Sequence, residues 1–226
     1  SMVDQNFFSS DRKRTSCIQN AFCSLIQNSK YHVYIEDEFI VTFKQKNGDW
    51  KSNKLGDTLY KRIMKAHKKK KNWKAIILVP LRPVKTFEET HGQFETRKMM
   101  STRYSASSKA LHSIITRLKA SGVNPSNYIQ FYSLRTWGVS EPHAFLATSQ
   151  IYTHSKVMIV DDRKCIFGNT RVSANIVEGG IDDNDAFFVQ DKEMVKSRMD
   201  GKDYDAGVFA SGLRQKLMRE HLGCDL

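Results

Sequence analysis

The 226-residue chain has few residues that could cross-link the fold or interrupt its helices and strands: it has four cysteines and four prolines. The cysteines form no C-x-x-C pair and show no zinc-site spacing with histidine; they are Cys17, Cys23, Cys165 and Cys224. This pattern disfavours a disulfide framework and a structural zinc site, and predicts reduced thiols in a cytosolic compartment. The longest apolar runs are strand-sized, far below the about 20 residues that a membrane span needs.

Basic residues outnumber acidic ones, with 36 Lys and Arg against 24 Asp and Glu and a net charge of +12. Such an excess predicts an anionic partner: nucleic acid, acidic lipid or a phosphate-bearing substrate. The length suits one domain with a substantial core. Because Ser1-Met2 resembles a cloning remnant, we expect residues 1–14 to be remnant and linker, and residues 15–226 to form that domain.

Helical and strand patterns alternate along the chain. Apolar residues at the 3.6-residue period predict helices over 16–26, 55–66 and 111–118, and a closing helix over about 204–222. Short apolar runs predict strands over 31–35, 74–80, 128–133, 150–160, 165–167 and 186–189. This alternation favours α/β layering, with helices outside a largely buried sheet.

One stretch of the sequence, from His154 to Gly168, contains the residues expected to take part in a reaction. His154 and Lys156 stand two residues apart on an extended apolar run, and Asp161 and Gly168 complete the pattern H-x-K-x4-D-x6-G. Two residues on alternate positions of a strand share a face, so a nucleophile or proton donor lies beside a fixed positive charge. That pairing suits a phosphodiester. Asp161 follows Lys156 at an odd interval, so we expect it to point away and hold the turn.

The pattern occurs once. His67 and Lys69 also read H-x-K, but Lys74 stands where the aspartate would be needed. Phosphodiester chemistry of this type usually needs two histidines, so the second one has to come from elsewhere.

Several separate stretches resemble the C-terminal catalytic lobe of a eukaryotic phospholipase D, of the HKD phosphodiesterase superfamily. These stretches are spread over nearly the whole length of the chain. They are residues 16–22, 34–39, 133–136, 151–156, 189–191 and 199–207. The resemblance implies an α/β/α layered sandwich with a mixed, largely parallel sheet. It also implies hydrolysis of phosphatidylcholine-type phospholipids to phosphatidate and a free head group, with transphosphatidylation as a side reaction and no metal or cofactor.

In such enzymes two lobes, each with one HKD motif, form one active site. The resemblance implies that the N-terminal lobe of the same parent protein supplies the histidine that attacks phosphorus and becomes a phosphohistidine. His154 would protonate the departing alcohol and then activate water, while Lys156 would neutralise phosphate oxygens. Asp161 is the third residue of the catalytic motif. The lobe alone would then be inactive.

The chain departs from the family pattern at the phosphate contacts. Asn169 and Arg171 stand in the segment where the family has G-S-x-N, so an amide and a guanidinium are expected to bind phosphate.

Further departures concern the residues that would orient the histidine. Asn184 aligns with the glutamate of the family's D-S-E, and Asp182, Asp183 and Asp185 are the candidates to replace its charge. Glu38 stands where glutamine is usual. We expect Glu36 and Glu38 to lie behind the catalytic residues and to pair with lysine or arginine, with acid–base work as the alternative.

The run Lys68, Lys69, Lys70 and Lys71 has two readings of equal weight. It is a solvated helix end favoured by the helix dipole, or a patch for an anionic membrane, with phosphoinositides among the candidate lipids. We expect a cytoplasmic protein with peripheral membrane association and no nucleic-acid partner. Two alternatives stay open: a homodimeric one-motif nuclease, and a degenerate protein that binds acidic lipid without catalysis.

Overall fold

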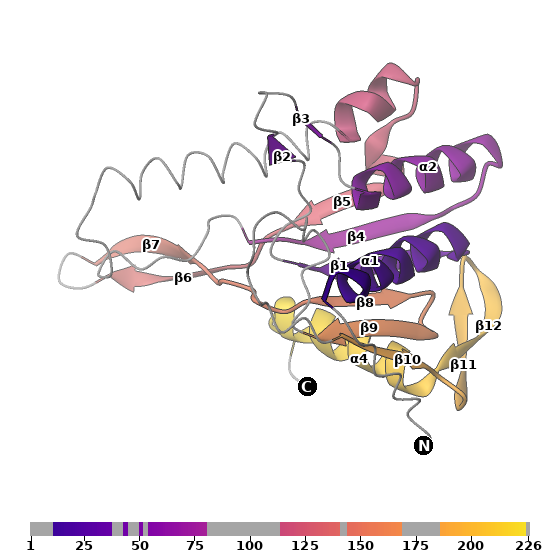
Figure 1. Cartoon of the computed structure of the whole chain (residues 1–226). Helices are drawn as coiled ribbons and strands as arrows, with labels where there is room; N and C mark the ends of the chain where they lie inside the picture. Colours follow the sequence, from indigo (N-terminus) through magenta and orange to yellow (C-terminus); the bar gives the residue numbers. More distant parts are fainter. Residues whose placement is uncertain are drawn as a thin grey trace.

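The computed structural model describes residues 11–37, 43–44, 50–51, 54–80, 114–140, 144–168 and 186–224 (Figure 1). Its helices are α1 (Asp11–Asn28), α2 (Lys54–Lys68), η1 (Pro125–Asn127) and α4 (Val208–His221), and residues 114–120 are also helical. Its strands are β1 (His32–Glu36), β2 (Phe43–Lys44), β3 (Trp50–Lys51), β4 (Lys74–Leu78), β5 (Ile129–Tyr132), β6 (Arg135–Ser140), β7 (Phe145–Gln150), β8 (Val157–Val160), β9 (Lys164–Gly168), β10 (Ala186–Gln190), β11 (Met194–Met199) and β12 (Lys202–Gly207).

The central element is a six-stranded sheet in the order β10-β9-β8-β1-β4-β5. β1, β4 and β5 run parallel, whereas β1 and β8, β8 and β9, and β9 and β10 pair antiparallel. The mixed α/β fold expected from the sequence is therefore confirmed. The expectation of a largely parallel sheet needs correction among the described strands, because three of the five strand pairings are antiparallel. The short turn 161–163 between β8 and β9 permits only antiparallel neighbours.

Helices cover both faces of this sheet (Figure 1). α1, α2 and the helical residues 114–120 pack on one face around a fully buried Trp73. α4 packs on the other face, where Ala210 joins Tyr34, Val157 and Ile159 in a second buried cluster. The alternation of β1 explains the split, since Val33 and Ile35 face the first layer and Tyr34 faces the second. No described helix is long and apolar enough to cross a membrane.

Three boundaries differ from the sequence expectations. α1 begins at Asp11, ahead of the start expected at residue 16. The expected strand over 150–160 is divided, because β7 ends at Gln150 and residues 151–156 are irregular before β8 begins. The closing helix begins at Val208, because residues 202–207 form β12, which pairs with β11.

The β11–β12 hairpin has a turn that the sequence does signal. Asp200 and Gly201 form a two-residue connection between the paired residues Met199 and Lys202. Both turn residues have positive φ angles, 52° and 73°. An Asp-Gly pair is favoured in such a turn because its twist matches that of the strands.

The β6–β7 hairpin projects away from the rest of the molecule (Figure 1). Trp137 pairs with Thr148 and Val139 with Leu146, so these four side chains share one face. Trp137, Val139 and Leu146 are 74%, 61% and 72% exposed. The hairpin thus presents an apolar face to solvent, directly before the segment that carries His154.

Asp191 caps α4 from a neighbouring segment. Its Oδ1 accepts a hydrogen bond from the Phe209 amide at 3.2 Å and its Oδ2 from the Ala210 amide at 2.8 Å. Gly207, the N-cap residue, has no side chain with which to cap the helix. A carboxylate at this position satisfies free amides and favours the positive end of the helix dipole. A Cβ on Gly207 would collide with the Asp191 side chain, which explains the need for glycine.

We therefore expect Gly207→Ala to lower the free energy of unfolding by about 1–3 kcal/mol, because the added methyl displaces the Asp191 cap. Urea unfolding followed by circular dichroism measures the change. Gly212→Ala is the control, because a Cβ there meets no atom within 4 Å. It lies inside α4 and should stabilise the chain by about 0.5–1 kcal/mol. Equal effects of the two substitutions would contradict the collision.

Candidate active site

His154 and Lys156 meet at the end of the sheet where β8 begins. The Lys156 Nζ lies 3.4 Å from the His154 Nε2 and donates a hydrogen bond to the His154 carbonyl at 3.3 Å. Lys156 is 5% exposed, whereas His154 is open to solvent. A lysine ammonium can only donate, so this contact requires the Nε2 as acceptor and the proton of the neutral ring on Nδ1. The exposed imidazole thus presents a basic nitrogen beside a held positive charge.

Ser155, between these two residues, points to the buried Glu36. The Ser155 hydroxyl donates a hydrogen bond to the Glu36 Oε2. Glu36 is 1% exposed and ends β1, where its Cα pairs with that of Val157. Because adjacent residues of an extended chain face opposite ways, this bond fixes the backbone that presents His154 and Lys156 on the other side. Glu36 therefore contacts the segment that carries His154 and Lys156 through Ser155.

Tyr34 and His221 complete the surroundings of Glu36. The Tyr34 hydroxyl donates to the Glu36 Oε1 at 2.5 Å, and the His221 Nε2 lies 3.5 Å from the same oxygen. The His221 Nδ1 lies 3.2 Å from the Tyr34 hydroxyl and is the donor, because the single phenol proton goes to Glu36. Burial, together with the Glu36 carboxylate, raises the pKa of Tyr34 well above its usual range. The expectation of a lysine or arginine partner is therefore corrected: among the described residues the ion-pair partner of Glu36 is His221 of α4, which no sequence pattern marks.

Asp161, the third residue of the motif, binds backbone at the opposite end of β1. Its carboxylate accepts hydrogen bonds from the amides of Lys30 at 2.7 Å, Tyr31 at 2.7 Å and His32 at 2.9 Å. The Asp161 carbonyl accepts a further bond from the Tyr204 hydroxyl at 2.7 Å. Its φ angle of 51° places it in the tight turn between β8 and β9. These contacts are structural: they hold the connection from α1 to β1.

Asp162 forms a buried ion-pair cluster beside Asp161. Arg214 of α4 donates to both of its oxygens, at 2.6 and 2.7 Å, and the His32 Nε2 lies 3.2 Å away. Burial alone would raise the pKa of Asp162, but the contacts from Arg214 and His32 outweigh it and lower that pKa to about 2. This cluster joins α4 to the sheet.

The remaining predicted site residues divide into two groups. Those outside the described residues are Glu38, Asn169, Arg171, Asp182, Asp183, Asn184 and Asp185. The lysines of the run 68–71 end α2 and precede β4, whose first residue, Lys74, pairs with His32 at the start of β1. They therefore lie at the end of the sheet opposite to Glu36. His67, whose H-x-K pattern lacks the aspartate of the full motif, lies on α2, with its Nδ1 3.3 Å from the Tyr128 hydroxyl.

The arrangement defines a class of site. An exposed imidazole nitrogen accepts or delivers a proton, and a buried lysine beside it attracts an anion and neutralises developing negative charge. Both groups come from one short segment, held from behind by the Ser155 bond to Glu36. The described residues thus supply one histidine–lysine pair that is able to contact an anion.

Comparison with known proteins places the chain in a family. The phospholipase D family model matches residues 2–226, so the chain belongs to the phospholipase D family. It is 43% identical to phospholipase D1 of Saccharomyces cerevisiae over 95% of its own length. It is 37% identical to phospholipase D1 of Schizosaccharomyces pombe over 92%, and 37% identical to human phospholipase D1 over 91%. The chain spans only 13%, 15% and 19% of the length of these relatives.

Among solved structures, the phospholipase D family member Nuc from Salmonella typhimurium aligns with a TM-score of 0.39 and 14% identity. The alignment covers 91% of this chain and 86% of Nuc. This structural similarity is too weak to support the fold assignment, which is based on the strand pairing given above.

The ion pair of Asp162 gives a pH-dependent prediction. Because its pKa is about 2 in the folded chain against an ordinary 3.8, its carboxylate stabilises the fold above about pH 4. That contribution declines as the pH falls toward 2. We expect Asp162→Asn to lower the free energy of unfolding by about 3 kcal/mol at pH 7, because Arg214 loses its partner.

Urea unfolding at pH 7 and pH 3 tests this expectation. The Asn variant should lose part of the stability difference between the two pH values. Asp203→Asn is the control, since the Asp203 side chain is 98% exposed and 3.9 Å from Arg198. The account is wrong if the Asp162 variant keeps the full pH dependence of the wild-type chain.

Proposed function

We propose that the chain is the C-terminal catalytic lobe of a phospholipase D, which hydrolyses phosphatidylcholine-type lipids to phosphatidate and a free head group. The observation that carries the proposal is the contact between the exposed His154 and the buried Lys156. Membership of the phospholipase D family supports it. The enzyme class is a phosphodiesterase that needs no cofactor of its own for this chemistry.

The proposed reaction has two steps. A histidine of the partner lobe attacks phosphorus and forms a phosphorus–nitrogen bond, while the bond from phosphorus to the head-group oxygen breaks. His154, protonated for this step, gives its proton to that oxygen. It then takes a proton from water, which attacks the phosphohistidine and releases phosphatidate. A primary alcohol in place of water gives transphosphatidylation.

The other residues support these steps. Lys156 offsets the charge that grows on the non-bridging oxygens, and Asn169 and Arg171 are proposed to bind the same phosphate. We infer that Glu36 positions the catalytic segment through Ser155. Since the chain carries one motif, the lobe alone is expected to be inactive without its N-terminal partner lobe.

The projecting β6–β7 hairpin favours a lipid substrate over nucleic acid. Its face with Trp137, Val139 and Leu146 is exposed and apolar. Such a patch suits the membrane interface, where tryptophan is enriched, and it does not suit a phosphate backbone. We infer that the hairpin contacts the bilayer beside the catalytic segment, as expected of a cytoplasmic protein with peripheral membrane association.

The first functional prediction concerns His154. In the parent protein with both lobes, His154→Ala should lower choline release from phosphatidylcholine vesicles by at least about 100-fold, because the leaving oxygen loses its proton donor. His67→Ala is the matched control, since His67 also stands two residues before a lysine. It should keep its activity. Equal activity of the His154 variant and the wild type would contradict the proposal, as would cleavage of DNA without phospholipid hydrolysis.

The second prediction concerns the hairpin. Trp137→Ser combined with Leu146→Ser should lower activity on phosphatidylcholine vesicles by at least about fivefold, because the apolar face no longer enters the interface. Activity on a monomeric short-chain phosphatidylcholine should stay unchanged. Val195→Ser is the control, because Val195 is an exposed apolar residue of the separate β11–β12 hairpin. An equal loss on both substrates would instead assign the hairpin to the partner lobe or the catalytic site.

A further inference from the structure

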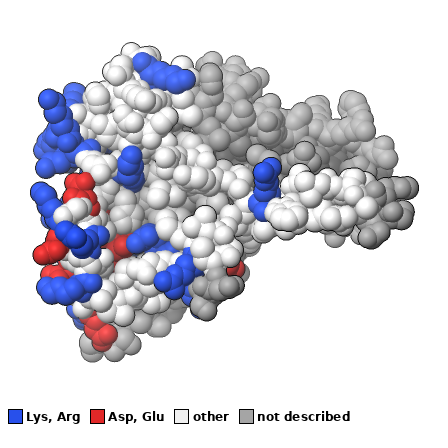
Figure 2. Space-filling view, turned by 180° about the vertical axis from the view of Figure 1, so that it is seen from behind, with Lys and Arg blue, Asp and Glu red and all other residues white. Residues whose placement is uncertain are grey.

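A partly buried histidine of the last helix faces the carboxylate behind the catalytic pair. The chain carries many exposed lysine and arginine side chains (Figure 2), yet among the described residues the ion-pair partner of Glu36 is His221. The His221 side chain is 16% exposed and the Glu36 side chain is 1% exposed. A charge in such surroundings is costly unless an opposite charge and hydrogen bonds compensate it. The reaction steps proposed above give His221 no role.

The hydrogen bonds around Glu36 indicate the protonation state of His221. The Tyr34 hydroxyl donates to the Glu36 Oε1 at 2.5 Å, so its oxygen is an acceptor for the His221 Nδ1 at 3.2 Å. The His221 Nε2 lies 3.5 Å from the same Glu36 oxygen. A neutral imidazole has one N–H, and only the imidazolium turns an N–H toward both oxygens. The geometry therefore calls for a positively charged His221 beside the buried carboxylate.

α4 presents His221 on the face that packs against the sheet. Ala210, Arg214 and His221 are separated by four and seven residues, which brings them to one side of a helix. Ala210 is fully buried. Arg214 donates to both oxygens of Asp162, at 2.6 and 2.7 Å, so its charge is already paired. His221 is thus the cation that α4 brings to Glu36.

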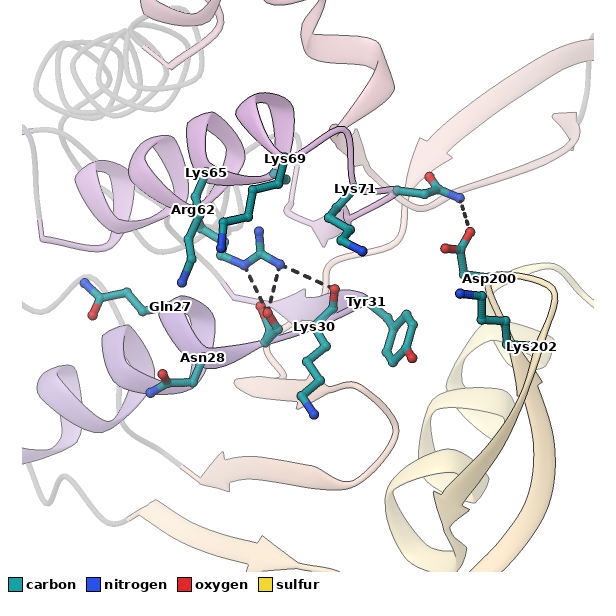
Figure 3. A pocket seen from close by; sticks show the side chains of 13 residues that line it. Gln27, Asn28, Lys30, Tyr31, Arg62, Lys65, Lys69, Lys71, Asp200 and Lys202 are labelled. Atoms are coloured by element: carbon teal, nitrogen blue, oxygen red, sulfur yellow. Dashed lines mark hydrogen bonds between the residues drawn. The ribbon is translucent and has the colours of Figure 1, made fainter.

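The backbone of β1 is held by contacts that do not involve His221. Ahead of the strand, Arg62 of α2 donates to the Ser29 carbonyl at 3.1 and 2.8 Å (Figure 3). At the end of the strand, the Cα of Glu36 pairs with that of Val157 in β8. These contacts fix the backbone of Glu36, whereas the direction of its carboxylate depends on the side chains around it.

The direction of this carboxylate matters because its second oxygen holds Ser155. The Ser155 hydroxyl donates to the Glu36 Oε2. Ser155 stands between His154 and Lys156, whose Nε2 and Nζ atoms are 3.4 Å apart. Because the two oxygens belong to one planar group, a cation on Oε1 sets the direction in which Oε2 meets the hydroxyl. Only a carboxylate and a hydroxyl thus separate His221 from the segment that carries the reactive pair.

We propose that His221 is a positioning residue, which acts through the Glu36 carboxylate on the segment that carries the reactive pair. Its role is to keep the geometry of that segment, and small displacements of reacting groups cost large factors in rate. The catalytic consequence rests on the proposed phospholipase function. The structural part of the inference does not, because the state of the His154 ring can be measured without any substrate.

Nitrogen NMR of the 226-residue chain tests the positioning in the absence of catalysis. In the wild type, the contact with Lys156 requires the proton of the neutral His154 ring on Nδ1. His221→Ala should release this constraint, so the chemical shifts of the His154 ring nitrogens move toward a mixture of tautomers. Should this variant unfold, as judged by circular dichroism, His221→Gln gives the same test, because it keeps N–H donors but not the charge.

Arg219→Ala is the matched control for this measurement. Arg219 is an exposed cation in the same last turn of α4, so its loss should leave the His154 shifts unchanged. Unchanged His154 shifts in a folded His221 variant would overturn the proposal. Equal changes in the Arg219 and His221 variants would also overturn it, because they would reflect the charge of the helix rather than the contact with Glu36.

Activity of the two-lobed parent protein tests the consequence for the reaction. His221→Ala should lower choline release from phosphatidylcholine vesicles by at least about tenfold, and Glu36→Gln by a similar factor. The double variant should be no slower than Glu36→Gln alone, because residues that act through one contact are not additive. Multiplied losses would show that His221 acts independently of Glu36 and overturn the proposal. Absence of choline release by the wild type would instead contradict the proposed phospholipase function, and the His154 shifts would still decide the positioning.

Discussion

The antiparallel pairing of β1 with β8 is the constraint on which both ends of the molecule depend. Val33 pairs with Val160 and Glu36 with Val157. The residues just before β8 therefore lie at the end of β1, where Ser155 bonds Glu36 and Lys156 contacts His154. The residue just after β8, Asp161, lies at the start of β1 and binds its amides. A register slip of one residue would turn each of these side chains to the wrong face.

This geometry gives the motif two separate duties. Its histidine and lysine form the proposed reactive pair, while its aspartate orders the connection between α1 and β1. β1 thus links the proposed phosphodiester site to this connection at the other end of the sheet. The β6–β7 hairpin adds an apolar face next to the reactive segment. On the face of the described residues that Figure 2 shows, lysine and arginine gather away from the proposed lipid contact.

The sequence pattern predicted those helices, strands and contacts that depend on residues close together in the chain. β1, β4 and α2 follow from apolar runs and the helical period, and the His154–Lys156 contact follows from the alternation of an extended segment. The β11–β12 hairpin was missed because Lys202–Gly207 has no clear apolar alternation, although Asp200-Gly201 marked its turn. The pairing of Glu36 with His221, and of Asp162 with Arg214, joins residues far apart in the chain. No spacing rule reports such contacts, because only the packing of α4 on the sheet creates them.

The central claim is that His154 acts as the acid and base for a histidine on a partner lobe. The most direct measurement uses a phosphatidyl ester of p-nitrophenol, whose leaving group needs no proton, with the two-lobed parent protein carrying His154→Ala. The account predicts a burst of one p-nitrophenolate per site, then arrest, with the phosphatidyl group trapped on a histidine of the partner lobe. Absence of a burst, continued turnover, or a phosphatidyl group on a residue of this chain would contradict it.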